Sequence, residues 1–100
     1  MSRARHKPIP IEALERTAAM LRVLAHPQRL RIVELLSEKR LTVGELAAAI
    51  GIPPNACSQH LNLMKARGLL ASVRDGKSIF YTVDSPNALT VIDCVRKHGM

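Results

Sequence analysis

The sequence VGELAAAIGIPPNACSQHLNLMKARG, residues 43–68, predicts two short helices joined by a tight turn. In the first helix Leu46 and Ile50 recur at helical spacing, and Gly51 ends it because glycine adopts the left-handed conformation without steric cost. Pro54 suits the first turn of a second helix, where the missing N–H would have no partner in any case. We expect this second helix to begin at Pro54 or the next residue and to end at the glycine that closes the segment.

The second helix carries an apolar stripe and an opposite polar stripe. The apolar stripe consists of Cys57, Leu61 and Met64, and the polar stripe of Asn55, Ser58, Gln59 and Asn62. A solvated face is usually filled with Lys and Glu, whereas short amide and hydroxyl groups hydrogen-bond to base edges in a major groove. The segment therefore predicts a DNA-reading unit, and the alternative is a polar face that contacts only solvent.

Size and charge limit the partners. One hundred residues make one domain, and 15 Lys and Arg against 8 Asp and Glu give a net charge of +7, which favours a polyanionic partner. The aromatic residues are Phe80 and Tyr81, too few for the stacking platforms that bind single-stranded nucleic acid. No stretch approaches the run of about 18 apolar residues of a membrane span, and the N-terminus lacks the apolar run of a signal peptide. We expect no membrane partner, a cytoplasmic location, and two free thiols, Cys57 and Cys94.

Further helices and a hairpin are predicted around the central unit. In chain order they are an amphipathic helix over residues 11–25, a helix over residues 27–37, a hairpin with strands at 69–74 and 77–83, and a last helix over residues 85–99. Asp75 and Gly76 are expected at the two central, positive-φ positions of the hairpin turn. This order predicts a mainly α winged helix-turn-helix domain over residues 11–100, with five helices and a two-stranded β-hairpin wing.

Residues 1–10 precede this domain and contain four basic side chains, Arg3, Arg5, His6 and Lys7, with two prolines. We interpret them as a flexible basic arm. The arm either contacts phosphates or is an unstructured solubilising tail.

The first and last helices are more apolar than one small core requires. Their apolar positions are Ile11, Leu14, Ala18, Leu21 and Ala25 in the first, and Ala88, Leu89, Val91, Ile92 and Val95 in the last. In the helix over residues 27–37, we expect Leu30, Val33, Leu35 and Leu36 to point inward. The surplus apolar surface predicts a homodimer through the first and last helices, with two recognition helices about 34 Å apart on a palindromic site.

Several motifs in this order resemble the ArsR/SmtB family of bacterial repressors over residues 11–98. They are LAHPQRLRIVELL at residues 24–36, SQHL at 58–61 followed by Leu63 and Gly68-Leu69, and RDGK at 74–77 followed by Tyr81. The resemblance implies a homodimer that occupies its operator until an inducer lowers its affinity for DNA.

The resemblance also implies where DNA is contacted. It places the groove contacts on Asn55, Ser58 and Gln59, and it matches His60 to the family's histidine. The position of His60 at the edge of the apolar stripe favours packing or a local hydrogen bond equally. The expected DNA-contacting set is completed by Asn62, Lys65, Arg74 and Lys77, of which the last two lie beside the wing tip. There the cations either reach a phosphate or minor groove or only solubilise the turn.

The family's metal ligands are absent from their expected positions. Residues 40–46, RLTVGEL, stand where metal-sensing relatives carry Cys-x-Cys, and residues 93–95 and 98–100 do not supply the family's other ligand set. The remaining pair, Cys94 and His98, lies one helical turn apart and would form a Cys₂His₂ zinc site across a dimer axis. We expect instead that no metal or other cofactor binds and that Cys94 is a small buried residue among aliphatic neighbours, with the zinc site as the alternative.

Cys57 stands where the recognition helix usually has an apolar residue. Because a thiol pKa can fall near a helix N-terminus, Cys57 is a candidate thiol sensor, with Cys94 as the second. Oxidation of Cys57 would disturb the packing that aims Ser58 and Gln59. The alternative is a cysteine that packs in the core in place of valine.

Together these patterns predict a sequence-specific transcriptional regulator that is not an enzyme. The resemblance implies a dimeric repressor of double-stranded operator DNA that an inducer of unspecified chemistry releases, and Cys57 and Cys94 add release by thiol modification. The alternatives are a non-specific or architectural DNA-binding protein without a sensor, and a winged helix that contacts another protein. Catalysis is not expected, because neither cysteine has a paired acid or a glycine-rich oxyanion turn nearby and the domain is too small for an obvious pocket.

Overall fold

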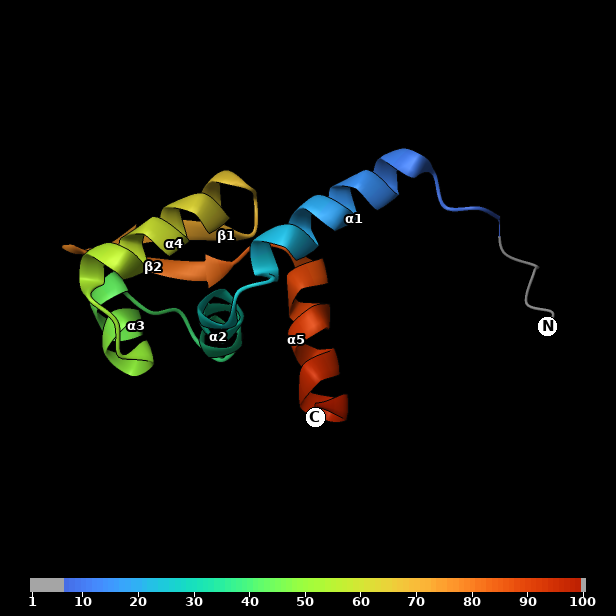
Figure 1. Cartoon of the computed structure of the whole chain (residues 1–100). Coiled ribbons are helices and arrows are strands. Elements are labelled where there is room, and N and C mark those ends of the chain that lie inside the picture. The colour runs from blue at the N-terminus through green and yellow to red at the C-terminus, as the bar shows by residue number, and fades with distance from the viewer. Residues whose placement is uncertain (1–6, 100) are drawn as a thin grey trace.

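The computed structural model describes residues 7–99, whose elements follow one another in the predicted order (Figure 1). The helices are α1 (Ile11–Leu24), α2 (Pro27–Leu36), α3 (Val43–Ile50), α4 (Pro54–Ala66) and α5 (Pro86–His98), and the strands are β1 (Leu70–Asp75) and β2 (Ser78–Val83). Within residues 7–99, five helices and a two-stranded antiparallel wing confirm the predicted winged helix-turn-helix fold. Residues 1–6 of the predicted basic arm lie outside the described residues, and residues 7–10 of the arm are exposed. Met100 also lies outside the described residues.

Local signals determine where α2 and α3 begin and end. The ring Nδ1 of His26 accepts a hydrogen bond from the backbone N–H of Gln28 at 3.2 Å and caps α2. A capping box starts α3, in which Thr42 Oγ1 accepts from the Glu45 N–H and the Glu45 carboxylate accepts from the Thr42 N–H. Gly51 follows α3 with a φ of 84°, the left-handed conformation that the sequence predicts.

The hairpin turn is shifted by one residue from its predicted position. Strand β1 continues through Asp75, which pairs with Ser78, so the central turn residues are Gly76 and Lys77. Gly76 has a positive φ of 65° and Asp75 does not, which is the arrangement of a turn with glycine at its first central position. The placement of the turn at Asp75-Gly76 is therefore wrong. Register is set by which residues the wing buries at its base, and a turn dipeptide alone does not carry that information.

The link between α2 and α3 also pairs with the wing. The Tyr81 N–H donates to the Leu41 carbonyl at 2.8 Å, and the Leu41 N–H donates to the Tyr81 carbonyl at 3.4 Å. This bridge was not predicted, because the residues before Leu41 have the composition of a polar connection. It attaches the wing to the helical part of the domain.

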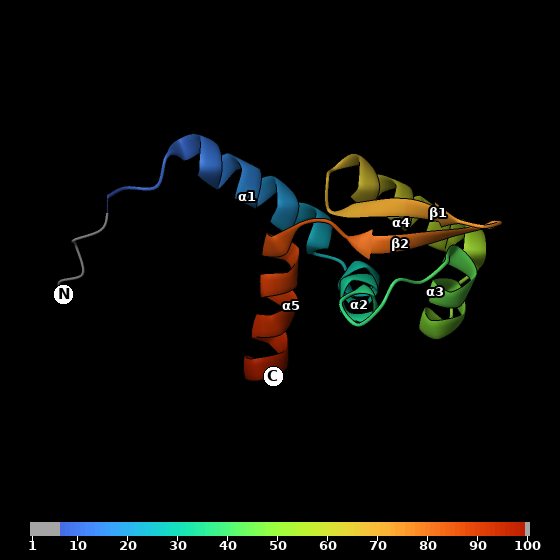
Figure 2. The ribbon, with the colours of Figure 1, turned by 180° about the vertical axis from the view of Figure 1, so that it is seen from behind.

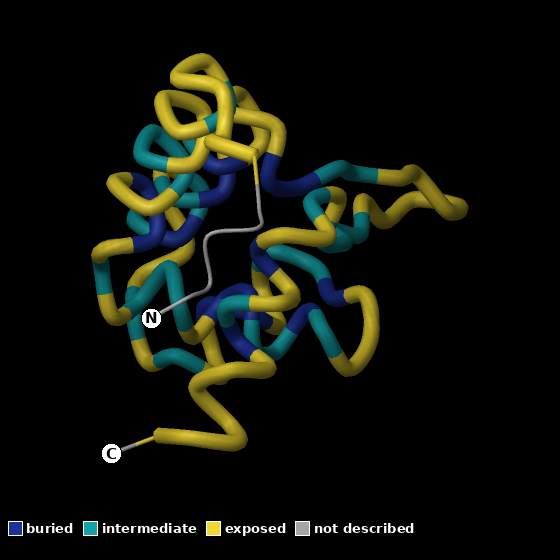
Figure 3. The backbone as a smooth tube through the Cα atoms, turned by 90° about the vertical axis from the view of Figure 1, so that its right-hand side faces the viewer, coloured by how far each residue is buried: buried dark blue, intermediate teal, exposed yellow. Residues whose placement is uncertain are grey.

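The core is formed by buried residues of α2, α3, α4, the base of the wing, α5 and the end of α1, and Figure 3 marks the buried segments in dark blue. The largest fully enclosed side chains of the core are Ile32, Val33, Leu46, Cys57, Leu61 and Met64, which include the whole apolar stripe predicted for α4. In α2 the prediction is partly right. Val33 and Leu36 are buried, Leu30 and Leu35 are half-buried, and Ile32, which was not expected inward, is fully buried.

Helix α1 reaches away from the rest of the domain, and α5 lies beside α2 (Figures 1 and 2). Only the end of α1 is buried, through Val23 and Leu24. The large apolar side chains that remain exposed on these two helices are Ile11, Leu14, Leu21, Leu89 and Val95. No helix within residues 7–99 combines the length and apolar character of a membrane span.

Candidate nucleic-acid interface

The polar stripe of α4 lies opposite its buried stripe. Asn55, Gln59 and Asn62 are exposed, and Ser58 is half-buried. Their spacing places them on one helical face. Because turning α4 about its axis would expose the enclosed apolar stripe, the rotation of this polar face is fixed. The face offers uncharged donors and acceptors of the kind that read base edges.

Lys65 joins the end of α4 to the wing. Its Nζ atom donates to Ser72 Oγ on β1 at 2.7 Å, and β1 lies beside α4 (Figure 2). The side chain was predicted to contact DNA, and the structure brings its ammonium group to the wing, where it remains exposed. An ammonium group has three donors, so the bond to Ser72 is compatible with a phosphate contact.

The wing tip carries the two predicted cations, and a third cation from the α2–α3 link contacts the wing. Arg74 and Lys77 are both exposed. The guanidinium of Arg40 lies 4.2 Å from the centre of the Phe80 ring and donates to Asp75 Oδ2 at 2.5 Å. Arg40 thus contacts the wing from the α2–α3 link, although no pattern in its own segment indicates this contact.

His60 lies on the side of α4 that contacts α2. Its Nδ1 atom accepts from Arg29 Nε–H at 3.1 Å, and its Nε2 atom lies 3.0 Å from Gln28 Oε1. The ring meets the ring of His26 edge to face, with centroids 4.7 Å apart. Burial lowers the pKa of His60, and His26 and Arg29 lower it further. Of the two roles expected for His60, these contacts support packing and hydrogen bonding within the protein.

The two cysteines have opposite surroundings. Cys57 is enclosed in the core, and burial raises the pKa of its thiol. The expectation of a lowered pKa is therefore wrong, because desolvation dominates at this position. Cys94 is exposed on α5, so its expected burial is wrong for the single chain. Within residues 7–99 of one chain, no three His, Cys, Asp or Glu side chains are grouped to hold a metal ion, and the alternative of a zinc site at Cys94 and His98 would require a second copy.

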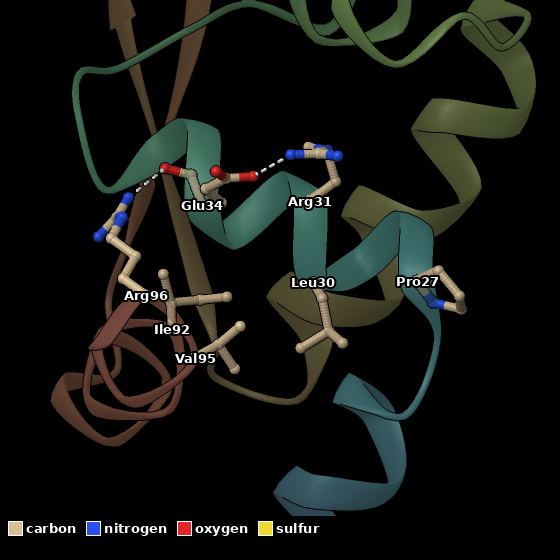
Figure 4. A pocket seen from close by; sticks show the side chains of 7 residues that line it. All are labelled: Pro27, Leu30, Arg31, Glu34, Ile92, Val95 and Arg96. Carbon is tan, nitrogen blue, oxygen red and sulfur yellow. Dashed lines mark hydrogen bonds and ion pairs between the residues drawn. The ribbon is translucent and has the colours of Figure 1, made fainter. Parts of the chain in front are cut away.

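A groove of about 300 Å³ lies between α2 and α5 (Figure 4). From the small size of the chain we expected no obvious pocket. Its lining residues are Pro27, Leu30, Arg31, Glu34, Ile92, Val95 and Arg96. The aliphatic side chains form the surface, and the charged groups at its edge bind one another, with Arg31 on the Glu34 carboxylate and Arg96 on the Glu34 carbonyl. The groove is thus apolar with an internally paired edge.

The chain is similar to known helix-turn-helix proteins. Residues 24–73 match the helix-turn-helix domain family. The HTH-type transcriptional repressor SmtB of Mycobacterium tuberculosis is 38 % identical over 93 residues, which cover 92 % of this chain and 69 % of that protein.

Solved structures show the same fold. Reduced HlyU of Vibrio cholerae, a protein named as a transcriptional activator, superposes with a TM-score of 0.81 at 27 % identity, over 89 % of this chain and 95 % of that chain. The homodimeric winged helix-turn-helix DNA-binding domain Mb0332 of Mycobacterium bovis superposes with a TM-score of 0.77 at 24 % identity, over 94 % and 87 % of the two chains.

Proposed function

Because the chain belongs to the ArsR/SmtB family of helix-turn-helix transcriptional regulators, we propose that it is a dimeric repressor that binds a specific palindromic operator in double-stranded DNA. The observation that carries this proposal is the exposed amide stripe of α4, formed by Asn55, Gln59 and Asn62. Amide side chains pair bidentately with adenine in the major groove, and a helix of fixed rotation presents them in a defined register. Such a regulator acts on DNA in the cytoplasm.

Two groups of side chains have different tasks in this proposal. Asn55, Ser58 and Gln59 read base edges, with Asn62 further along the same face. Lys65, Arg74 and Lys77 contact phosphates, which gives affinity without sequence preference. The charge of Arg40 adds to that of the wing, and the net charge of +7 favours the approach to DNA.

The exposed apolar side chains of α1 and α5 support a twofold dimer through these helices. Leu14 and Leu21 of α1, and Leu89 and Val95 of α5, are exposed in the single chain. A second copy would remove this apolar surface from water. The two recognition helices would then lie about 34 Å apart, one turn of DNA.

We also propose that an inducer or thiol modification releases the repressor. In the single chain Cys94 is the thiol that a reagent reaches, and Cys57 is shielded by the core. Modification would therefore begin on α5, one of the two helices assigned to the dimer.

Selection of duplexes from a randomised pool tests the proposal. We expect a palindromic consensus that the protein prefers over random duplex by at least about 10³ at physiological salt. Equal affinity for unrelated sequences would instead favour a non-specific or architectural protein, and no binding to DNA would favour a winged helix that contacts another protein. A reporter promoter carrying the selected duplex should lose activity, whereas increased transcription would indicate an activator.

A further inference from the structure

Four polar side chains meet at the junction between α2 and the recognition helix α4. They are His26, Gln28 and Arg29 at the start of α2, and His60 on α4. None of them is needed to explain the exposed DNA-reading face. They lie where the recognition helix is attached to the rest of the domain.

Arg29 connects three helices through one guanidinium group. Its Nη1 atom donates to the Val23 carbonyl in the last turn of α1 at 3.2 Å, and its Nε atom donates to His60 Nδ1 at 3.1 Å. The side chain itself comes from α2. The position of α4 relative to α1 and α2 therefore depends on a bond that the His60 ring accepts.

The partners determine the protonation of the His60 ring. Arginine has only donors and stays protonated in proteins, so Nδ1 must present a lone pair to Arg29. The other nitrogen, Nε2, then carries the proton and donates to the side-chain amide oxygen of Gln28, Oε1, 3.0 Å away. A second proton on Nδ1 would place an N–H group against the Arg29 N–H.

We propose that His60 is a positioning residue whose neutral, Nε2-protonated ring holds α4 on α2, and that protonation of Nδ1 breaks the contact with Arg29, displaces α4 and weakens binding to DNA. This rests on the function proposed above. Within the described residues, the titratable and charged groups that face the ring are His26 from the α1–α2 link and Arg29 from α2. Both oppose a second proton.

The direction of the effect separates this role from direct contact with DNA. A histidine beside phosphates gains positive charge as the pH falls, and binding then strengthens. A histidine that must accept from Arg29 loses its contact under the same conditions. Acidification should therefore lower the affinity.

The experiment measures the affinity for the duplex that wild type selects, from about pH 8 to about pH 5.5. We expect the affinity of wild type to fall as the pH drops, by less than about tenfold per His60 at pH 5.5, since the pKa of His60 is lowered from 6.5 and each pH unit below a pKa contributes about tenfold. His60→Asn keeps an acceptor near Arg29 but cannot take up a proton, so its affinity should vary little with pH. Arg29→Gln keeps an amide donor without the charge, so the midpoint of its loss should move to higher pH.

Nitrogen NMR of the free protein tests the same proposal without DNA. We expect the His60 ring to be protonated on Nε2 at about pH 8, and the α4 amide signals to shift with the midpoint at which Nδ1 takes up its proton. Three outcomes would each overturn the proposal. They are an affinity for DNA that is constant or rises on acidification, a pH dependence of affinity in His60→Asn equal to that of wild type, and a His60 ring protonated on Nδ1. If wild type selects no duplex, the proposed function fails, and the NMR result still decides the role of His60.

Discussion

The Nη2 atom of Arg96, in α5, lies 2.7 Å from the hydroxyl oxygen of Ser37, the residue that follows α2. The same atom is 3.4 Å from the Glu34 carbonyl oxygen (Figure 4) and 3.3 Å from the Glu38 carboxylate. A cation at the C-terminal end of a helix is stabilised by the partial negative charge of the last carbonyl groups. One guanidinium of α5 therefore holds the end of α2.

Arg96→Met should lower the free energy of unfolding by about 0.5–1.5 kcal/mol, because methionine keeps an aliphatic chain but loses these hydrogen bonds. The matched control is Lys97→Met, since Lys97 is 68 % exposed and pairs with Asp93 on its own helix. The control should change stability by less than about 0.5 kcal/mol. Urea unfolding at fixed protein concentration measures both. Equal losses would show that Arg96 contributes no more than a surface cation.

Gln59→Ala should weaken binding to the selected duplex by about 1–3 kcal/mol and relax the preference at one base pair, because it removes a reader of base edges. Lys77→Ala should weaken binding to specific and random duplexes alike and reduce the salt slope by about 1. Fluorescence anisotropy at several salt concentrations measures both effects. If Gln59→Ala weakened both duplexes equally, Gln59 would contact the DNA backbone and not the bases.

Leu14→Glu should shift the protein from dimer to monomer, because it places a charge in the apolar surface assigned to the dimer. Val73→Glu is the control. Its side chain on the wing is 46 % exposed, against 45 % for Leu14, but lies outside α1 and α5. Sedimentation velocity should find a dimer for the control. A dimer that survives Leu14→Glu would place the interface on another surface.

The helices and their order could be predicted because each carries its own signals in the chain. Pro27, Gly51 and Pro54 act on the backbone of their immediate neighbours, and the apolar stripe of α4 follows from helical periodicity. The polar face of α4 could be predicted for the same reason, since it is what remains opposite the stripe.

Contacts between distant segments could not be predicted in this way. Arg40 meets Phe80, and His60 meets Arg29, through packing that no local pattern encodes. The pKa of Cys57 was misjudged for a related reason. Proximity to a helix N-terminus can be read from the sequence, whereas complete enclosure depends on which elements close over the thiol.

The stability of the protein should fall as the pH drops below about 7, with His60 as one contributor. The native pKa of His60 is lowered from its ordinary value of 6.5, so on acidification the unfolded chain binds a proton before the native protein does. The loss ends once the pH is below the native pKa. His60→Asn cannot take up this proton, so the stability difference between wild type and variant should shrink between about pH 7.5 and about pH 5.5. Urea unfolding at the two pH values measures it, and a constant difference would contradict the assignment.

Cys57 should react with a thiol reagent only when the core opens. The thiolate is the species that attacks the reagent, and burial both shields the Cys57 thiol and raises its pKa. Cys94→Ser leaves Cys57 as the single thiol, and its reaction with an aromatic disulfide reagent should be slow and should accelerate with urea below the unfolding transition. Cys57→Ala leaves the exposed Cys94, whose reaction should be fast and insensitive to such urea concentrations. Absorbance of the released thiolate follows both reactions. Fast reaction of Cys94→Ser without urea would restore Cys57 as a direct sensor and would mean that α4 opens readily in the native protein.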